Sequence, residues 1–243
     1  MPERYRHVFV EPHFDDVALS CGGSVQVFAA RGEPVLVVTL FAGDPGRAAV
    51  VTEFAAGQHA RWGAADDPIA QRRAEQQAAL DLLGADWLPM PWLDAIYRGE
   101  QYRSDDELFG VVKPGDAKLV DEIAARLSDL ARLHPEAIWR APMAVGNHVD
   151  HQIALRASAA LPGLLLYEDF PYVAREPGAL AKRVAELGAH EGPIVPLAAD
   201  LLDRKVEAIA RYRSQIATLF GDGAAMEQAV RAYFASGERY WVA

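Results

Sequence analysis

The chain of 243 residues has little of several features that mark whole classes of protein. Its single cysteine, Cys21, excludes both an internal disulfide and a cysteine-rich zinc site. With 24 Lys and Arg against 34 Asp and Glu, its formal net charge is −10, which argues against electrostatic binding to nucleic acid or an anionic membrane. Its apolar runs all fall short of the ~18 residues that a membrane-spanning helix needs.

The first residues, Met-Pro-Glu-Arg-Tyr-Arg-His, lack the apolar core and the cleavage site of a secretory signal. We therefore expect a cytoplasmic protein with neither a nucleic acid nor a membrane as partner. A G-x-G-x-x-G phosphate loop is also missing, so a flavodoxin-like or nucleotide-binding protein remains an alternative without a motif in its favour. The composition that remains, 51% hydrophobic and 24% charged, is that of an ordinary globular protein.

Short apolar runs alternate with helical patterns along the chain. Strands are predicted at residues 7–10, 34–41, 137–141 and 164–169, with a Pro-rich edge strand at 87–93. Helices are predicted at residues 17–30, 71–83, 116–133, 151–160, 197–219 and 224–234. This alternation predicts an α/β fold: a single Rossmann-like domain over residues 1–243, with a mostly parallel sheet flanked by helices. The irregular stretch at 43–70 is expected to be a functional or mobile loop.

Two loops that follow predicted strands concentrate histidine and aspartate. Pro12-His13-Phe14-Asp15-Asp16 follows the first strand, and Gly146-Asn147-His148-Val149-Asp150-His151 follows the strand at 137–141. Ligands of open α/β sheets bind at the carboxyl ends of the strands. Three His and three Asp at that edge, in a chain with seven His, are most simply explained by a catalytic metal site with three protein ligands.

The spacing within each loop separates the roles of its members. His148 and His151 lie three residues apart, so their side chains share a face if they begin a helix. The adjacent Asp15 and Asp16 point in different directions, so one can ligate while the other accepts a proton from the attacking water. A simpler interpretation is that the Asp residues only cap helices and the His residues lie at the surface. It accounts for the composition of either loop alone, but poorly for both loops together.

These two motifs resemble those of a known family. Pro12-His13-Phe14-Asp15-Asp16 is similar to the Pro-His-Pro-Asp-Asp signature of the PIG-L/LmbE-like zinc-dependent N-deacetylases, and His148-Val149-Asp150-His151 to their second motif, His-Pro-Asp-His. The resemblance extends over most of the chain through Arg72-x-x-Glu75 and Lys205…Tyr212-x-Ser214-Gln215. Phe14 and Val149 replace the two prolines of the motifs; neither position is a ligand, so the chemistry is expected to survive with a different loop rigidity.

The resemblance implies zinc ligands at His13, Asp16 and His151, with Fe²⁺ or Co²⁺ as alternatives to Zn²⁺. It also implies that Asp15 is the general base, that His148 stabilises the oxyanion, and that Asp150 accepts from a histidine ring and fixes its orientation. The implied reaction is hydrolysis of an N-acetyl group from an amino-sugar or glycoconjugate of GlcNAc type. Arg72 and Asp94 are candidates for contacts to sugar hydroxyls, although Arg72 with Glu75 is equally a surface ion pair on a helix.

Two other functions stay open at this point. One is an amidase that cleaves a larger acyl group from a glucosamine-containing conjugate. The other is a metal- or sugar-binding protein without turnover, against which the retention of Asp15 and His148 argues. We also expect the aromatic ring of Phe14 to lie near the mouth of the site. The side chain of Glu11 is expected either to alter the charge there or to face solvent. One of the two acids Glu168 and Asp169 is expected to line the pocket. Apolar residues near Trp87–Tyr97 leave room for a homo-oligomer.

Overall fold

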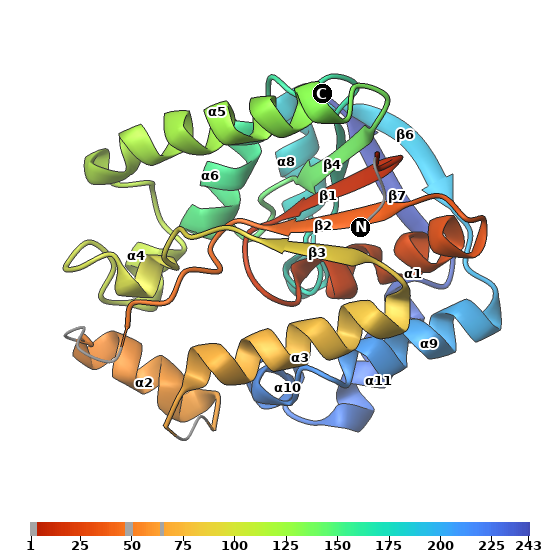
Figure 1. Ribbon diagram of the computed structural model, residues 1–243. Helices are drawn as coiled ribbons and strands as arrows, with labels where there is room; N and C mark the ends of the chain where they lie inside the picture. The colour runs from red at the N-terminus through yellow and green to blue at the C-terminus, as the bar shows by residue number, and fades with distance from the viewer. Residues whose placement is uncertain (1–3, 47–50, 64–65) are drawn as a thin grey trace.

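The computed structural model describes residues 4–46, 51–63 and 66–243 (Figure 1). Its centre is a seven-stranded sheet with the order β3-β2-β1-β4-β5-β7-β6. The strands are β1 His7–Glu11, β2 Val35–Thr39, β3 Asp86–Pro89, β4 Ile138–Pro142, β5 Leu165–Tyr167, β6 His190–Val195 and β7 Glu238–Val242. Strands β1 to β5 pair in parallel, and β7 is antiparallel to both β5 and β6. The predicted α/β fold with a mostly parallel sheet is confirmed, and that residues 1–243 form one domain stays a prediction.

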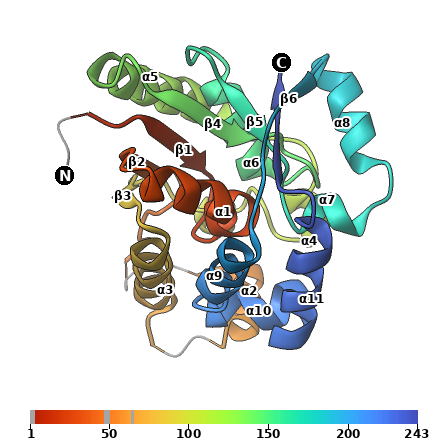
Figure 2. The same ribbon diagram turned by 90° about the vertical axis from the view of Figure 1, so that its right-hand side faces the viewer.

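Helices cover both faces of this sheet (Figures 1 and 2). On one face lie α5 (Ala117–Leu133) and α6 (Val149–Ser158); on the other lie α1 (Asp16–Ala30), α3 (Pro68–Leu83) and α9 (Ala199–Ile209). Every residue of β1 and β2 is buried, because helices cover both faces of these strands. This explains why the central strands are continuous apolar runs instead of alternating ones.

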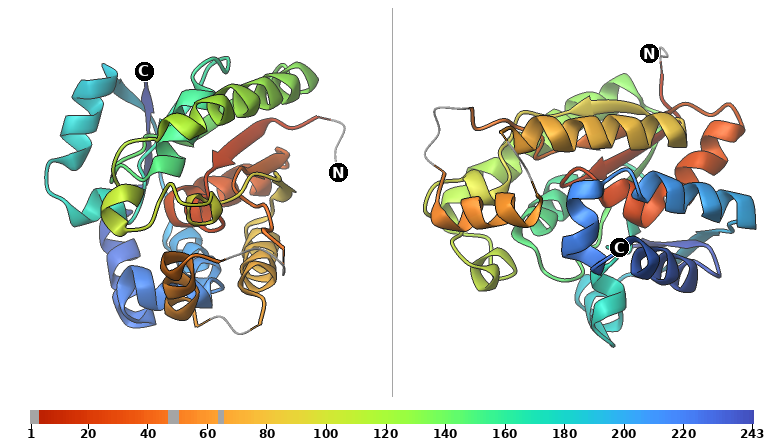
Figure 3. Two further views of the ribbon diagram at one scale, coloured as in Figure 1. Left: turned by 90° about the vertical axis from the view of Figure 1, so that its left-hand side faces the viewer. Right: turned by 90° about the horizontal axis from the view of Figure 1, so that it is seen from below.

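Shorter helices surround the end of the sheet at which the parallel strands finish. They include α2 (Glu53–Arg61), α4 (Asp105–Leu108) and α7 (Tyr172–Arg175), and Figure 3 shows α2 and α4 at this end. The chain also forms α8 (Ala179–Leu187), α10 (Arg213–Phe220) and α11 (Gly223–Tyr233). Within the described residues, every helix is too short or too polar to cross a membrane.

Two of the sequence predictions about elements are wrong. The stretch at 43–70 is not one irregular loop, since it contains α2 and the start of α3; its residues 47–50 and 64–65 lie outside the described residues. Side-chain caps start both helices: Thr52 accepts from Ala55 N–H, and Asp67 accepts from Ala70 N–H. The single helix predicted at 197–219 is two helices, α9 and α10, with Tyr212 buried at the break between them.

Candidate metal centre and active site

A cavity of about 230 Å³ lies at the carboxyl ends of the central strands. Its walls include four of the residues singled out in the two motifs, His13, Asp15, Asp16 and His148, together with Arg72 and Asp94. Asp150 and His151 are buried behind this wall. The local folding explains the arrangement: one motif turns from β1 into α1, the other begins α6, and the sheet places the two loops beside each other.

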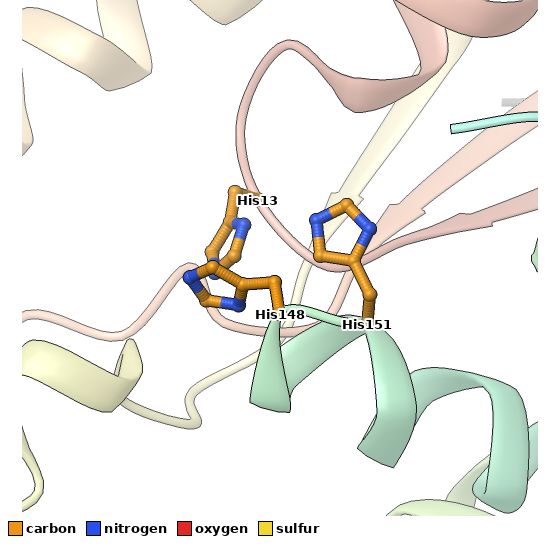
Figure 4. A group of neighbouring side chains, drawn as sticks. All are labelled: His13, His148 and His151. Atoms are coloured by element: carbon orange, nitrogen blue, oxygen red, sulfur yellow. The ribbon is translucent and has the colours of Figure 1, made fainter. Parts of the chain in front are cut away.

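Three histidine rings converge at this point (Figure 4). His13 comes from the loop after β1, and His148 and His151 come from the start of α6. The centroid of the His13 ring lies 4.8 Å from that of His148 and 5.5 Å from that of His151. His148 is the N-cap of α6, and its ring centroid lies 5.4 Å from that of His151, so the expectation that both side chains lie on one side of a helix start is confirmed.

Asp16 lies between His13 and His151, and each histidine has a ring nitrogen close to one of its two carboxylate oxygens. His13 Nδ1 lies 3.6 Å from Asp16 Oδ2, and His151 Nε2 lies 3.5 Å from Asp16 Oδ1. Two ligands of a tetrahedral ion with bonds of about 2.0–2.1 Å lie about 3.3 Å apart. His151 Nε2 is buried and makes no hydrogen bond to any described residue, which is costly for a ring nitrogen unless another group occupies the space.

Two groups of side chains, neither of which is the set of His13, Asp16 and His151, bring one donor atom per residue within 4.8 Å of one another: His13 with His148 and His151, and His13 with Asp94 and Asp150. In the second group, Asp150 already serves three donors: its Oδ2 accepts from His13 Nε2 and Ala95 N–H, and its Oδ1 accepts from Arg98. In the first, His148 Nδ1 accepts from Asp150 N–H at 3.2 Å, which leaves its other nitrogen as a hydrogen-bond donor. Both contacts favour His13, Asp16 and His151 as the ligand set.

Buried carboxylates orient the two histidines. His13 Nε2 donates to Asp150 Oδ2 at 2.9 Å, and His151 Nδ1 donates to Asp169 Oδ1 at 2.7 Å. In the neutral form of each ring, the opposite nitrogen keeps its lone pair and faces Asp16, as a metal ligand requires. Arg98 Nη2 donates to Asp150 Oδ1 at 2.6 Å and keeps the pKa of that buried carboxyl well below its usual range, although burial alone would raise it.

The adjacent carboxyls of Asp15 and Asp16 have pKa values displaced in opposite directions. Burial, together with the charge of Asp16, raises the pKa of Asp15 to about 7. Burial also penalises the charge of Asp16, but His151 and hydrogen bonding with His13 outweigh it and lower the pKa to about 2. Such a pair suits a site in which one carboxylate stays ionised as a ligand while the other exchanges a proton.

His148 is suited to donate a hydrogen bond without carrying a charge. Burial, and then the neighbouring His13, hold the pKa of His148 well below its usual value. Its Nδ1 accepts from the backbone of Asp150, so the proton of the neutral ring is on Nε2. Phe109 packs edge-on against the ring, with centroids 5.2 Å apart.

Comparison with known proteins agrees with this chemistry. Residues 8–161 match the PIG-L family, described as GlcNAc-PI de-N-acetylase. The chain belongs to the PIG-L family. Both the resemblance drawn from the motifs and the expectation of a metal-dependent N-deacetylase are thereby confirmed.

Relatives of the chain within the family match it over nearly its whole length. It is 29% identical to 2'-N-acetylparomamine deacetylase of Niallia circulans, over 97% of this chain and 90% of the relative. A structure of the teicoplanin-pathway deacetylase is 29% identical, with a TM-score of 0.83 over 97% of this chain and 96% of the other. A zinc-inhibited form of teicoplanin deacetylase is 27% identical, with a TM-score of 0.80 over 97% of each chain.

Several expectations about residues near the PIG-L motifs need correction. Glu11 is fully buried and faces neither the cavity nor solvent; its carboxylate accepts from Val17 N–H at 2.8 Å and from Thr39 Oγ1 at 2.5 Å. Phe14 is also buried, and packs edge-on against Trp87 with centroids 5.9 Å apart instead of reaching the mouth of the site. The Pro-to-Phe replacement therefore fills the core.

Arg72 is not paired with Glu75 on a helix surface, since its side chain is buried at the cavity wall. It donates to Phe14 O at 3.2 Å, and its Nη1 lies 4.0 Å from Asp94 Oδ2. Glu75 instead accepts from Ser214 N–H and its hydroxyl.

The motifs alone do not point to two charged residues of the site. Asp169 follows β5 and reaches His151, but neither it nor Glu168 lines the cavity, so the expectation that one of these acids does is wrong. Glu168 instead accepts from Tyr233 and Trp241, away from the cavity. Arg98 follows a short 3₁₀ turn after β3, and nothing in the local sequence links it to Asp150.

Proposed function

We propose that this PIG-L family deacetylase removes the N-acetyl group of a GlcNAc-type amino sugar, free or in a glycoconjugate, with Asp15 as general base. The observation that carries the proposal is the position of the buried Asp15 carboxyl on the wall of the cavity, beside the donor atoms of His13, Asp16 and His151. A binding protein without turnover needs no base at that position.

His13, Asp16 and His151 are the residues that we propose to hold the metal. A divalent ion bound there supplies a Lewis acid that polarises the acetamide carbonyl and makes water easier to deprotonate. Two imidazoles and a carboxylate suit Zn²⁺, and also accept Fe²⁺ or Co²⁺. Since teicoplanin deacetylase has a zinc-inhibited form, each metal is best added in stoichiometric amount.

The remaining steps belong to the side chains. Asp15 takes a proton from the water that attacks the carbonyl carbon, and its raised pKa of about 7 suits a group that must also give that proton back. His148, with its proton on Nε2, donates to the oxygen that gains negative charge. When the C–N bond breaks, Asp15 returns the proton to the leaving nitrogen, and the products are acetate and the free amine.

The size of the cavity supports a small acyl group. At about 230 Å³, it is below the range of roughly 300–1,000 Å³ that encloses drug-sized ligands. Such a space takes an acetamide and one sugar ring, while the rest of a larger conjugate stays outside. We propose that Arg72 and Asp94, on the same wall, contact the sugar hydroxyls. An amidase for a larger acyl group is not favoured, because the relatives described above are deacetylases.

Acetate release from a panel of N-acetylated amino sugars, among them 2'-N-acetylparomamine, tests the function, with metal content measured on the same samples. We expect Asp15→Ala to keep the metal and lose turnover, and His13→Ala to lose both. Undiminished activity of Asp15→Ala would remove the base assignment. A metal-loaded protein that releases no acetate from the panel would shift the proposal to another acyl group or glycoconjugate.

Two further expectations stay predictions. Association of copies through the apolar residues near Trp87–Tyr97 is tested by light scattering on the purified protein. A cytoplasmic location is tested by fractionation of the cells that produce it.

A further inference from the structure

One peptide unit at the site is held from two sides by the same helix. Arg72 Nη2 donates to the carbonyl oxygen of Phe14 at 3.2 Å, and Gln76 Oε1 accepts from the N–H of Asp15 at 3.2 Å. These two groups belong to one peptide bond, between Phe14 and Asp15. Arg72 and Gln76 lie one turn apart on α3 and therefore on the same face of it, toward the loop that follows β1.

The backbone of Asp15 needs such a constraint. Its φ is 102°, in the region that disfavours residues with a side chain. A conformation of this kind persists only where the surroundings determine it from several directions, and it is common at functional sites. The torsion also sets the direction of the Asp15 side chain, so the orientation of the preceding peptide decides where the carboxyl points.

The amide of Gln76 is itself fixed in one orientation. The side chain is fully buried, its Nε2 donates to Glu11 Oε1 at 2.5 Å, and its Oε1 accepts from the Tyr212 hydroxyl at 2.6 Å. If the amide were turned over, its NH₂ would face the Asp15 N–H, which cannot accept, and its oxygen would face Glu11 Oε1, which already accepts from Thr39 Oγ1. Glu11 therefore keeps the acceptor of Gln76 directed at Asp15.

We propose that Gln76 is a positioning residue for deacetylation, which acts by orienting the Phe14–Asp15 peptide and through it the carboxyl of Asp15. The inference rests on the proposed role of Asp15 as general base. Arg72 holds the other side of the same peptide, which gives this residue a role besides its proposed contact with substrate. Gln76 is absent from the wall of the cavity, so its effect on turnover passes through the loop.

The variant Gln76→Met tests this, because it keeps the length of the side chain and removes the acceptor. We expect kcat to fall by up to about 100-fold, the loss typical of a slightly misplaced catalytic group. KM and the stoichiometry and affinity of metal binding should stay within about threefold, since Asp150 and Asp169 still orient the two histidines. Metal binding is measured by titration of the metal-free protein, independently of activity.

A matched control separates positioning from stability. Leu80 lies one turn further along α3, is fully buried in a hydrophobic cluster and does not line the cavity. Leu80→Ala should lower the thermal midpoint at least as much as Gln76→Met and leave kcat per metal-loaded site within twofold.

A double-mutant cycle with Asp15→Asn decides whether Gln76 acts through Asp15. We expect Gln76→Met to reduce the residual turnover of Asp15→Asn by less than about threefold. A wild-type kcat in Gln76→Met, or a full additional loss in the Asp15→Asn background, would overturn the proposal for Gln76. Wild-type turnover in Asp15→Asn alone would instead overturn the role of Asp15 as base.

Discussion

Replacing Asp169 by asparagine should weaken metal binding through the tautomer of His151. Both oxygens of Asp169 accept hydrogen bonds, one from His151 Nδ1 at 2.7 Å and the other from Val145 N–H at 2.9 Å. An asparagine offers a single oxygen for these two donors. If that oxygen stays with Val145, the amide NH₂ faces His151 Nδ1, which can accept only when the ring proton is on Nε2. The nitrogen proposed to bind the metal would then lack its lone pair.

The expected size of the effect follows from what such a carboxylate contributes. Loss of the partner of a metal-binding histidine weakens metal affinity by roughly 10- to 100-fold, or about 1.4–2.7 kcal/mol. Competition between the metal-free protein and a chromophoric chelator measures this directly. The free energy of unfolding of the metal-free protein, from urea titration, shows separately how much stability the substitution costs.

The neighbouring residue provides the control. Glu168 is also buried and accepts from Trp241 Nε1 at 2.9 Å and from Tyr233, without a contact to the metal site. Glu168→Gln should reduce stability while its metal affinity stays within about twofold of the parent protein. If Asp169→Asn binds metal as tightly as the parent, or if Glu168→Gln loses as much affinity, the reasoning about the His151 tautomer is wrong.

Three further changes have expected outcomes. Chelation should abolish acetate release, and one equivalent of metal should restore it; activity that survives complete removal of metal would refute metal dependence. Arg98→Met leaves the buried carboxylate of Asp150 without its cation, so metal affinity should fall by about tenfold in the same chelator assay. An unchanged affinity would show that Arg98 has no part in orienting His13. Glu238→Gln breaks a buried ion pair with Lys205, so the free energy of unfolding measured in urea should fall by about 3 kcal/mol or more while kcat stays unchanged. A loss of less than about 1 kcal/mol would contradict this expectation.

The size of the Glu238 effect follows from its position. The carboxylate accepts from Lys205 Nζ at 2.7 Å and from the N–H groups of Gly23 and Ser24 at 2.8 and 2.6 Å, so β7, α9 and α1 meet at this side chain. The absence of a side chain at Gly23 lets Leu197 and Glu238 come close to α1, because a Cβ at this position would lie 2.4 Å from Leu197 Cδ2. Gly23 thus allows α1 to pack closely against Leu197 and Glu238.

Local patterns in the sequence were sufficient for the central part of the fold. The runs that became β1 and β2 were recognisable because helices bury both faces of these strands, which favours apolar residues at consecutive positions. The run that became β4 is apolar apart from Arg140. By contrast, β6 contains Gly192 and Pro193 and is mostly exposed, so its sequence carries no strand pattern. It is a strand because β7 pairs with it, a contact between segments more than forty residues apart.

The sequence by itself determined which donor atoms meet at the active site. Parallel strands end at one edge of a sheet, so the motifs after β1 and β4 had to lie at the same edge, and their residue types favour a metal. The pairing of β1 with β4, which places the two motifs side by side, comes from the structure. Only the tertiary structure decided how those donors are held. Asp169 follows β5 and holds His151, and Arg98 follows β3 and holds Asp150. Gln76 lies on α3 and holds the N–H of Asp15. Glu11 is buried because Thr39 and Gln76 supply its donors. Such contacts depend on distances between segments remote in sequence, which no local pattern encodes.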